Sequence, residues 1–204
     1  MDHEVYTIGY GNRSVEQFVD LLLRYKIEVV CDVRSTPYSR RFPDFGREQL
    51  RNSLKHARIK YLFLGDELGA RPSDPEMYLN GKASYSAMSR SSKFISAIER
   101  VNEGSRNHVV AIMCAEKDPL DCHRAILVAP NLQLAGSSIK HIDSRGNIET
   151  QSGLEHRLLK VYGLDQVALF DKAESSATLR DAYCRRGEDL AYDVDAAYRA
   201  KPSA

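Results

Sequence analysis

Apolar runs of strand length alternate with segments of helical period along most of this chain, and this alternation constrains its fold more than any other feature. After the first run, apolar residues recur at helical spacing at Val15, Phe18 and Leu22. Two parallel strands need a crossover connection, which is usually a helix. The alternation therefore predicts an α/β fold with a single, mostly parallel sheet that carries helices on both faces. Its strands are expected in the runs EVYTIGYG, IEVVCDV, KYLFLG, HVVAIMCAE and SIKHID.

Two helix starts carry the pattern of a capping box, in which a hydroxyl residue and a Glu or Gln three positions later satisfy each other's backbone amides. The pairs are Ser14 with Gln17 and Ser152 with Glu155, and each predicts a helix that begins at the hydroxyl residue. Between these helices, the segment 66–89 is rich in Gly, Pro and Ser and has no sustained period. Such a segment is typical of an active-site cover, an inserted binding loop or a disordered stretch.

The apolar pattern divides the chain into two unequal parts. Residues 1–165 hold all the predicted strands and form the α/β domain. Residues 166–204 are more polar, yet Leu179, Tyr183 and Leu190 leave enough apolar surface for docking. We predict a helical or partly flexible C-terminal appendage there, which packs on the domain or forms a contact between subunits of a homo-oligomer.

Composition and charge exclude several classes of protein. With 43% hydrophobic and 28% charged residues the chain has an ordinary globular composition, which argues against wholesale disorder. A formal net charge of +1 disfavours a nucleic-acid coat protein and a polybasic membrane binder. No apolar run approaches the ~18 residues of a membrane span, and the start of the sequence lacks the pattern of a signal peptide. Four cysteines without a Cys-x-x-Cys pair indicate reduced thiols, so we expect a cytoplasmic protein without membrane contact.

Polar residues follow the predicted strands closely, and the carboxyl ends of parallel strands open at the same edge of a sheet. We therefore expect one strand-end cleft that binds a small anionic or nucleotide-like ligand. The candidate ligand-binding residues are Tyr10, Asn12, Ser14, Asp32, Arg34, Ser35, Arg40 and Arg124. The candidate catalytic residues are Glu67, Glu116, Cys122 and His123.

The segment DVRSTPYSR offers two guanidinium groups on either side of a stiff proline turn. A guanidinium fork suits phosphate or carboxylate, because two parallel donors meet two acceptors. The alternative is that Arg34 forms a salt bridge with Asp32 or Glu67 and supports the structure. The number of arginines in this part of the chain favours an anion site.

The segment CAEKDPLDCHR is the most specific feature of the sequence. It places a thiol at the end of a buried strand and a Cys-His-Arg cluster at a predicted helix start, where helix amides favour negative charge. These residues supply a nucleophile, a base and a cation, although Cys114 is equally well explained as a small buried hydrophobic residue. A phosphatase-type loop is disfavoured, because it would require an arginine at position 120, which is a leucine.

Metal binding receives less support from the sequence. Cys114, Cys122 and His123 are sufficient in number for a partial zinc site, but their spacing matches no standard pattern and a fourth ligand is not obvious. We therefore expect neither a metal nor a cofactor. Glu67, between glycines after the third strand, is typical of a general base or of the nucleophile in glycosidic cleavage, or else it holds an arginine in place.

Four motifs occur in the order TIGYGNRS, DVRSTPYSR, YLFLGDELGARP and CAEKDPLDCHR. As a series they resemble the family called domain of unknown function 488, over approximately residues 5–160. The resemblance implies a compact α/β domain with a polar site, and it carries no secure reaction. The Asp and Arg of the second strand and the Cys-His-Arg cluster match the family pattern. Tyr10 stands where the pattern has a histidine, so a general-base role does not carry over there, and Ala70 replaces the second residue of a Gly-Gly pair.

Together these features favour an enzyme, a hydrolase or group transferase, that acts on a phosphorylated, nucleotide-like or nucleic-acid-derived substrate. Arginines would hold the anion, and Glu67, Glu116 or Cys122 with His123 would do acid–base or nucleophilic work. Cleavage of an N-glycosidic bond is one concrete version. The alternative is a non-catalytic sensor or adaptor that binds a nucleotide or a partner in the same cleft. A nucleic-acid surface is a third reading, which the near-neutral net charge argues against.

Overall fold

The computed structural model describes residues 3–165 and 172–195. Its main feature is a six-stranded sheet of order β3-β2-β6-β1-β7-β8, in which the first five strands are parallel and β8 is antiparallel to β7. The prediction of an α/β fold with a mostly parallel sheet is therefore confirmed. The strands are β1 (Glu4–Gly9), β2 (Val29–Asp32), β3 (Lys60–Phe63), β6 (Val110–Cys114), β7 (Ser138–Ile142) and β8 (Ile148–Thr150).

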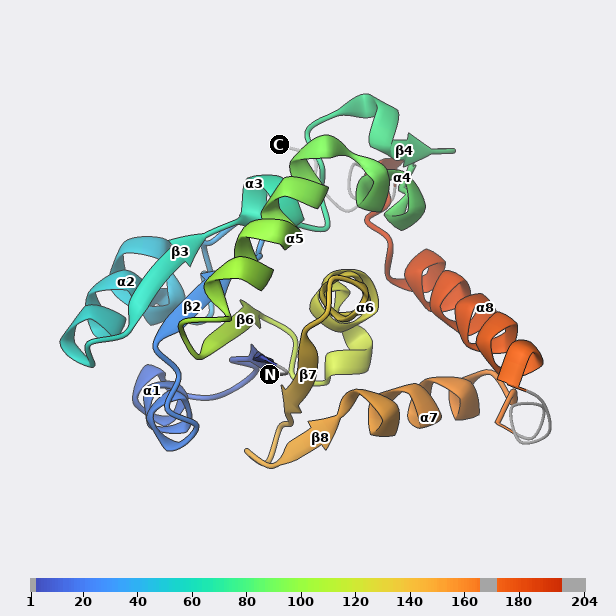
Figure 1. Ribbon diagram of the computed structural model, residues 1–204. Helices are drawn as coiled ribbons and strands as arrows, with labels where there is room; N and C mark the ends of the chain where they lie inside the picture. The colour runs from blue at the N-terminus through green and yellow to red at the C-terminus, as the bar shows by residue number, and fades with distance from the viewer. Residues whose placement is uncertain (1–2, 166–171, 196–204) are drawn as a thin grey trace.

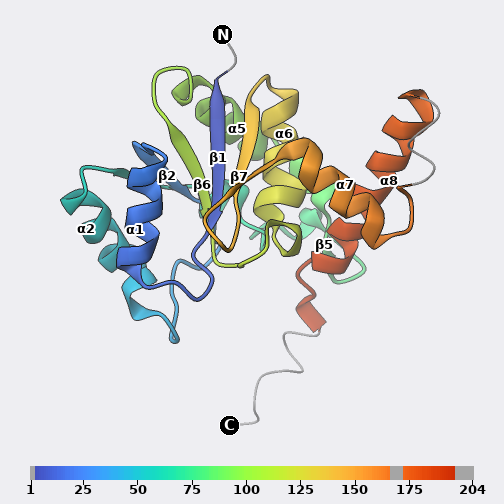
Figure 2. The ribbon, with the colours of Figure 1, turned by 90° about the horizontal axis from the view of Figure 1, so that it is seen from below.

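Helices cover both faces of the sheet, as the sequence predicted. Helices α1 (Val15–Arg24) and α2 (Arg47–His56) lie on one side, and α5 (Ser92–Gly104) and α6 (Ala129–Leu134) lie on the other (Figures 1 and 2). The strand residues alternate between these two layers. Tyr6 and Ile8 of β1 pack in the cluster of α1 and α2, whereas Val5 packs in that of α5.

The central strand β6 is buried along its whole length, as is typical of a parallel strand that helices cover on both faces. It pairs with β1 on one side and β2 on the other. Gly9 at the end of β1 lies opposite Cys114 at the end of β6. The sheet therefore brings the residues that follow β1, β2 and β6 to one edge.

One of the two predicted helix starts is correct and the other is wrong. Ser14 caps α1 in a complete capping box with Gln17. Helix α7 (Gln151–Val161) instead begins after Thr150, whose hydroxyl accepts the backbone N–H of Gly153 at 3.1 Å. The reason is the short strand β8, which the apolar pattern does not predict and which ends directly at Thr150.

The segment 66–89 contains short ordered elements. After α3 (Gly65–Leu68) a hairpin forms from β4 (Tyr78–Leu79) and β5 (Lys82–Ala83), followed by α4 (Tyr85–Arg90). The two residues that connect its strands, Asn80 and Gly81, both have positive φ, of 50° and 77°. This is the backbone that a two-residue hairpin turn requires and that Asn-Gly adopts readily.

The C-terminal part of the chain contains the predicted helix, α8 (Lys172–Leu190). It packs along α7 and over the helical turn that precedes α6, where Ala182 joins a buried cluster with Leu120 and Leu158. Beyond α8 the chain runs back to the hairpin of β4 and β5. There Ala83 donates its backbone N–H to the Tyr192 carbonyl, and Val194 donates to the Gly81 carbonyl. Residues 166–171 and 196–204, which belong to the predicted appendage, lie outside the described residues.

Candidate active site

A pocket of about 370 Å³ opens at the carboxyl ends of β1, β2 and β6. It includes six of the residues that the sequence singled out: Tyr10, Arg34, Ser35, Glu116, Cys122 and His123. Its other lining residues are Thr36, Tyr38, Ala70, Arg71, Tyr85, Cys114, Ala115, Asp121, Leu190 and Tyr192. The pocket is thus formed by the strand ends, by the segment 66–89 and by the chain that follows α8.

The turn after β2 is held together by a buried ion pair. Arg34 donates from Nε to Oδ1 of Asp32 at 2.9 Å and from Nη2 to Oδ2 at 2.6 Å, and its Nη1 donates to the Phe45 carbonyl at 2.9 Å. The Tyr61 hydroxyl also donates to Oδ2 of Asp32, at 2.7 Å. Arg34 is 5% exposed and Asp32 is fully buried. Arg34 therefore has the structural role that is the alternative interpretation of the segment DVRSTPYSR.

His123 connects the Cys-His-Arg cluster to this turn. Its Nε2 lies 3.0 Å from the carbonyl oxygen of Val33, the residue between Asp32 and Arg34. Its Nδ1 lies 3.9 Å from Sγ of Cys114 and 3.8 Å from Sγ of Cys122. Two motifs that are far apart in the sequence thus meet at one wall of the pocket.

The second carboxylate of the site, Glu116, follows β6 and points toward the same sulfur. Its Oε2 lies 2.9 Å from Sγ of Cys122. Burial, together with the negative charge of Cys122, raises the pKa of Glu116. Burial alone would also raise the pKa of Cys122, but the Cys114 thiol, Arg124 and His123 act against it and hold that pKa well below its usual value.

In contrast to Cys122, the other two groups of the cluster, Cys114 and His123, have raised pKa values. The hydrogen bond to Cys122 and burial raise the pKa of Cys114 well above its usual value. Burial opposes a charged His123, yet the Cys122 sulfur and Glu116 raise its pKa. Cys122 is therefore the more acidic of the two thiols.

Arg124 lies beneath the pocket and does not line it. The side chain is fully buried, and its Nη1 donates to the Glu116 carbonyl at 2.9 Å. Among the described residues, Nε and Nη2 have no hydrogen-bond partner, and no carboxylate forms an ion pair with this guanidinium. The guanidinium is therefore placed to stabilise a negative charge on the Cys122 sulfur. A ligand in the pocket does not reach it, because Arg124 does not line the pocket.

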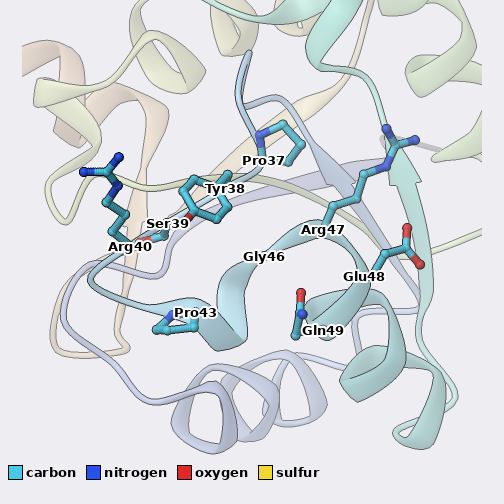
Figure 3. Close-up of a pocket in the computed structure, with 9 residues that line it drawn as sticks. All are labelled: Pro37, Tyr38, Ser39, Arg40, Pro43, Gly46, Arg47, Glu48 and Gln49. Atoms are coloured by element: carbon cyan, nitrogen blue, oxygen red, sulfur yellow. The ribbon is translucent and has the colours of Figure 1, made fainter.

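The remaining candidates lie elsewhere. Glu67 is on α3 and faces Arg100 at 3.4 Å, and Ser14 caps α1 at the surface. Asn12 is exposed in the turn after β1. Arg40 lines a second pocket of about 460 Å³ between the turn after β2 and α2, with Arg47 on the opposite side of it (Figure 3). This pocket adjoins the strand-end pocket at Tyr38. The structure does not bring these residues into the strand-end pocket.

Two tyrosines that line the pocket, Tyr85 and Tyr192, are not among the candidate residues that the sequence suggests. Tyr85 begins α4, and burial together with the charges of Cys122 and Glu116 raises its pKa. Tyr192 follows α8, and the guanidinium carbon of Arg71 lies 4.6 Å from the centre of its ring. A tyrosine outside the strand ends gives no sequence signal for a site, because only long-range contacts bring it there.

Comparison with known proteins gives one match. Residues 14–129 match the family described as Domain of unknown function DUF488, and this match includes the turn after β2 and the Cys-His-Arg cluster. No curated protein and no solved structure matches the chain. Within the described residues, no helix has the length and apolar character needed to cross a membrane.

Proposed function

The chain belongs to the DUF488 family, and from the pocket at its strand ends we propose that it is an enzyme, a hydrolase or group transferase, that acts on a small anionic, nucleotide-like substrate. The observation that carries this proposal is the convergence of Glu116, Cys122 and His123 on one wall of that pocket. Binding alone does not require a thiol, an imidazole and a carboxylate within contact distance of one another. Such an arrangement is typical of nucleophilic or acid–base chemistry.

Other residues that line the pocket support the class of substrate. Tyr85 and Tyr192 offer aromatic rings, and Arg71 offers an exposed guanidinium that stacks on Tyr192. Aromatic rings suit a planar base, and a guanidinium suits a phosphate or carboxylate. Arg71, rather than Arg34, is the anion-binding residue in this proposal, because Asp32 and Phe45 already engage the Arg34 guanidinium.

Glu116 is the proton acceptor in the proposed reaction. Its carboxylate lies beside the Cys122 sulfur and lines the pocket, so it reaches a proton on either a thiol or a water molecule there. The attacking group is the Cys122 sulfur or a water molecule beside it. A reducing compartment such as the cytoplasm suits this site, because all four cysteines are free thiols.

Ligand binding is tested by a thermal-shift screen with nucleosides, nucleoside monophosphates, ribose 5-phosphate and inorganic phosphate. A ligand that binds only the folded state raises the melting temperature by mass action. We expect a nucleotide-like anion to stabilise the protein, and Arg71→Ala to weaken its binding about tenfold or more, as the loss of a charge-assisted hydrogen bond would. Arg40→Ala is the matched control, because Arg40 lines the second pocket and not the strand-end pocket. Stabilisation that survives Arg71→Ala would contradict the assignment of this residue.

Catalysis is tested by the release of phosphate or free base from each stabilising ligand. We expect Glu116→Gln to lower turnover ~10²–10⁴-fold, the usual contribution of a general base. Glu67→Gln is the matched comparison, because that carboxylate pairs with Arg100 outside the pocket. Loss of turnover in Glu67→Gln alone would overturn the proposed reaction centre. Tight binding without any turnover would favour the sensor or adaptor.

A further inference from the structure

Three ligand atoms of the pocket wall lie close enough together to bind one metal ion. Sγ of Cys114, Sγ of Cys122 and Nδ1 of His123 all lie within 4.8 Å of one another, and the two sulfurs are 3.9 Å and 3.8 Å from the nitrogen. Zinc with Zn–S of ~2.3 Å and Zn–N of ~2.0 Å holds tetrahedral sulfur and nitrogen ligands ~3.6 Å apart. The two sulfur–nitrogen distances are therefore close to those that a shared zinc ion would set.

The hydrogen bond of His123 leaves the correct nitrogen free for a metal. The Val33 carbonyl, 3.0 Å from Nε2, accepts hydrogen bonds and cannot donate, so Nε2 carries the proton. The lone pair of Nδ1 then points toward the two sulfurs. Histidines that bind metals usually donate their other ring N–H to a carbonyl or carboxylate in this way, which fixes the ring orientation. The ring is therefore already oriented to become a ligand.

The charges around the cluster suit two thiolates. Arg124 is fully buried beside it, and Nε and Nη2 have no hydrogen-bond partner among the described residues. A buried cation without a counter-charge is strongly unfavourable. The negative charge of metal-bound thiolates at Cys114 and Cys122 would compensate it. The cysteines are 3% and 2% exposed, so the cluster is also shielded from solvent on the side away from the pocket.

The remaining side of the cluster faces the pocket, which all three residues line together with Glu116. Structural zinc sites have four protein ligands, whereas catalytic sites have three and keep one position open for water or substrate. We propose that Cys114, Cys122 and His123 bind one Zn²⁺ ion whose fourth position opens to the strand-end pocket. The spacing of these residues matches no standard zinc pattern, because β6 and the helical turn before α6, rather than a short metal-binding loop, bring them together.

The ion specifies the attacking group of the proposed hydrolysis, and this step rests on the proposed function. Zinc lowers the pKa of its bound water, and that water loses one proton to Glu116, beside the Cys122 sulfur. The resulting hydroxide forms a bond to the electrophilic carbon or phosphorus of the substrate. The bond to the leaving group breaks with its electron pair, and Glu116 returns the proton to that group. One water is consumed, and no oxidant or reductant is needed.

The first test measures metal in the full-length protein. We expect one equivalent of zinc after purification without chelator, and one equivalent of Co²⁺ bound by the chelator-treated protein. The Co²⁺ form should show the sulfur-to-cobalt charge-transfer absorption of a thiolate site. Protein that contains no zinc and binds neither Zn²⁺ nor Co²⁺ would overturn the proposal. This measurement uses the unaltered chain and does not depend on the folding of any variant.

The second test assigns the ligands. We expect Cys114→Ser, Cys122→Ser and His123→Ala each to weaken Co²⁺ binding by more than the ~10–100-fold that the loss of an outer-shell partner costs. Cys31→Ser is the matched control, because Cys31 is equally buried but lies outside the cluster. An equal loss of binding in Cys31→Ser would show that the effect is general destabilisation and would contradict the assignment.

The third test separates this inference from the proposed function. Glu116→Gln should keep its zinc and lose turnover, whereas loss of zinc would make Glu116 the fourth ligand and overturn the open position. Zinc bound with full stoichiometry but without turnover on any ligand would refute the proposed hydrolase and leave the metal site standing. Turnover that is unchanged after complete removal of zinc would refute the role of the ion in the reaction and leave the enzyme standing.

Discussion

The ion pair between Asp32 and Arg34 shows that an arginine can stabilise the structure at a position where the sequence suggests that it binds a ligand. Three donors of the guanidinium are engaged, two by Asp32 and one by the Phe45 carbonyl. The pair holds the turn that presents the Val33 carbonyl to His123. The arginine therefore contributes to the site by fixing its position, and the exposed Arg71 is better placed to reach a ligand.

Removing the charge of Asp32 should destabilise the protein strongly. Asp32→Asn leaves the Arg34 cation buried without its partner, which typically costs ~3–5 kcal/mol. Glu103→Gln is the control, because Glu103 forms an ion pair with Arg106 at the surface and such pairs contribute ~1 kcal/mol or less. Urea unfolding measures both variants. A loss of less than ~1 kcal/mol in Asp32→Asn would show that the turn holds without the pair.

His141 makes the stability depend on pH. It is fully buried on β7, where Nδ1 lies 2.8 Å from the Thr7 hydroxyl and Nε2 lies 2.8 Å from Oε1 of Gln151. Burial lowers its pKa to about 4, from the 6.5 of an exposed histidine, and the positive charges of Arg124 and Arg157 contribute. The unfolded chain therefore takes up this proton at higher pH than the folded protein does.

The sign of the effect follows from that difference. The stability due to neutral His141 is complete above about pH 6.5 and is lost as the pH falls to about 4, by ~3 kcal/mol in total. The free energy of unfolding should be measured across this range for the wild type, for His141→Gln and for His156→Gln, whose side chain is exposed. The pH dependence should become shallower in His141→Gln only. An unchanged slope in that variant would contradict the assignment.

Among the elements, β1 and β6 meet most closely where the site begins. A Cβ on Gly9 would lie 1.8 Å from the carbonyl oxygen of Glu116, so no residue with a side chain fits at the end of β1 without a shift of the backbone. That carbonyl also accepts from Arg124. The glycine therefore allows the chain after β6 to cross directly over the end of β1.

Gly9→Ala should consequently destabilise the protein by ~1–3 kcal/mol or more, the usual cost of overpacking a closed site. Gly104→Ala is the matched control, because no atom lies within 4 Å of the added Cβ at the end of α5. That change should be neutral or stabilising by up to ~1 kcal/mol, since alanine favours a helix. Chemical denaturation compares the two. Equal stability of both variants would show that the backbone at Glu116 moves aside at no cost.

The sequence predicted those elements that local pattern determines. The five parallel strands, the helices on both faces and the cap at Ser14 are correct, because burial period and hydrogen bonding within a few residues specify them. Strand β8 was missed, because it is short and its pairing with β7 depends on a turn between them. The start of α7 was misplaced for the same reason.

In the candidate site, too, the sequence predicts what the strand topology determines and does not predict the contacts of individual side chains. Parallel strands bring their ends to one edge, so the meeting of the turn after β2 with the Cys-His-Arg cluster follows from topology. The partners of individual side chains do not follow from it. The pairing of Glu67 with Arg100 and the arrival of Tyr192 at the pocket depend on contacts between segments distant in the sequence.

In the whole molecule, α8 connects the pocket to the core of the domain. Arg186 donates to the Leu120 carbonyl just before the Cys-His-Arg cluster, and Leu190 and Tyr192 beyond it line the pocket. The chain after α8 is also bonded to the hairpin of β4 and β5, through Tyr192 and Val194. Displacement of α8 should therefore disturb both the stability of the domain and the binding of ligands.

Ala182→Leu tests this coupling, because Ala182 is fully buried where α8 meets the cluster of Leu120 and Leu158. Overpacking there should lower the free energy of unfolding by ~1–3 kcal/mol. Ala177→Leu makes the same change at an exposed position of the same helix and should alter it by ~0.5 kcal/mol or less. If α8 and the domain form one cooperative unit, Ala182→Leu keeps a single unfolding transition and also weakens ligand-induced stabilisation. A separate early transition, with the main transition and ligand binding unchanged, would instead make the C-terminal helix an independent appendage.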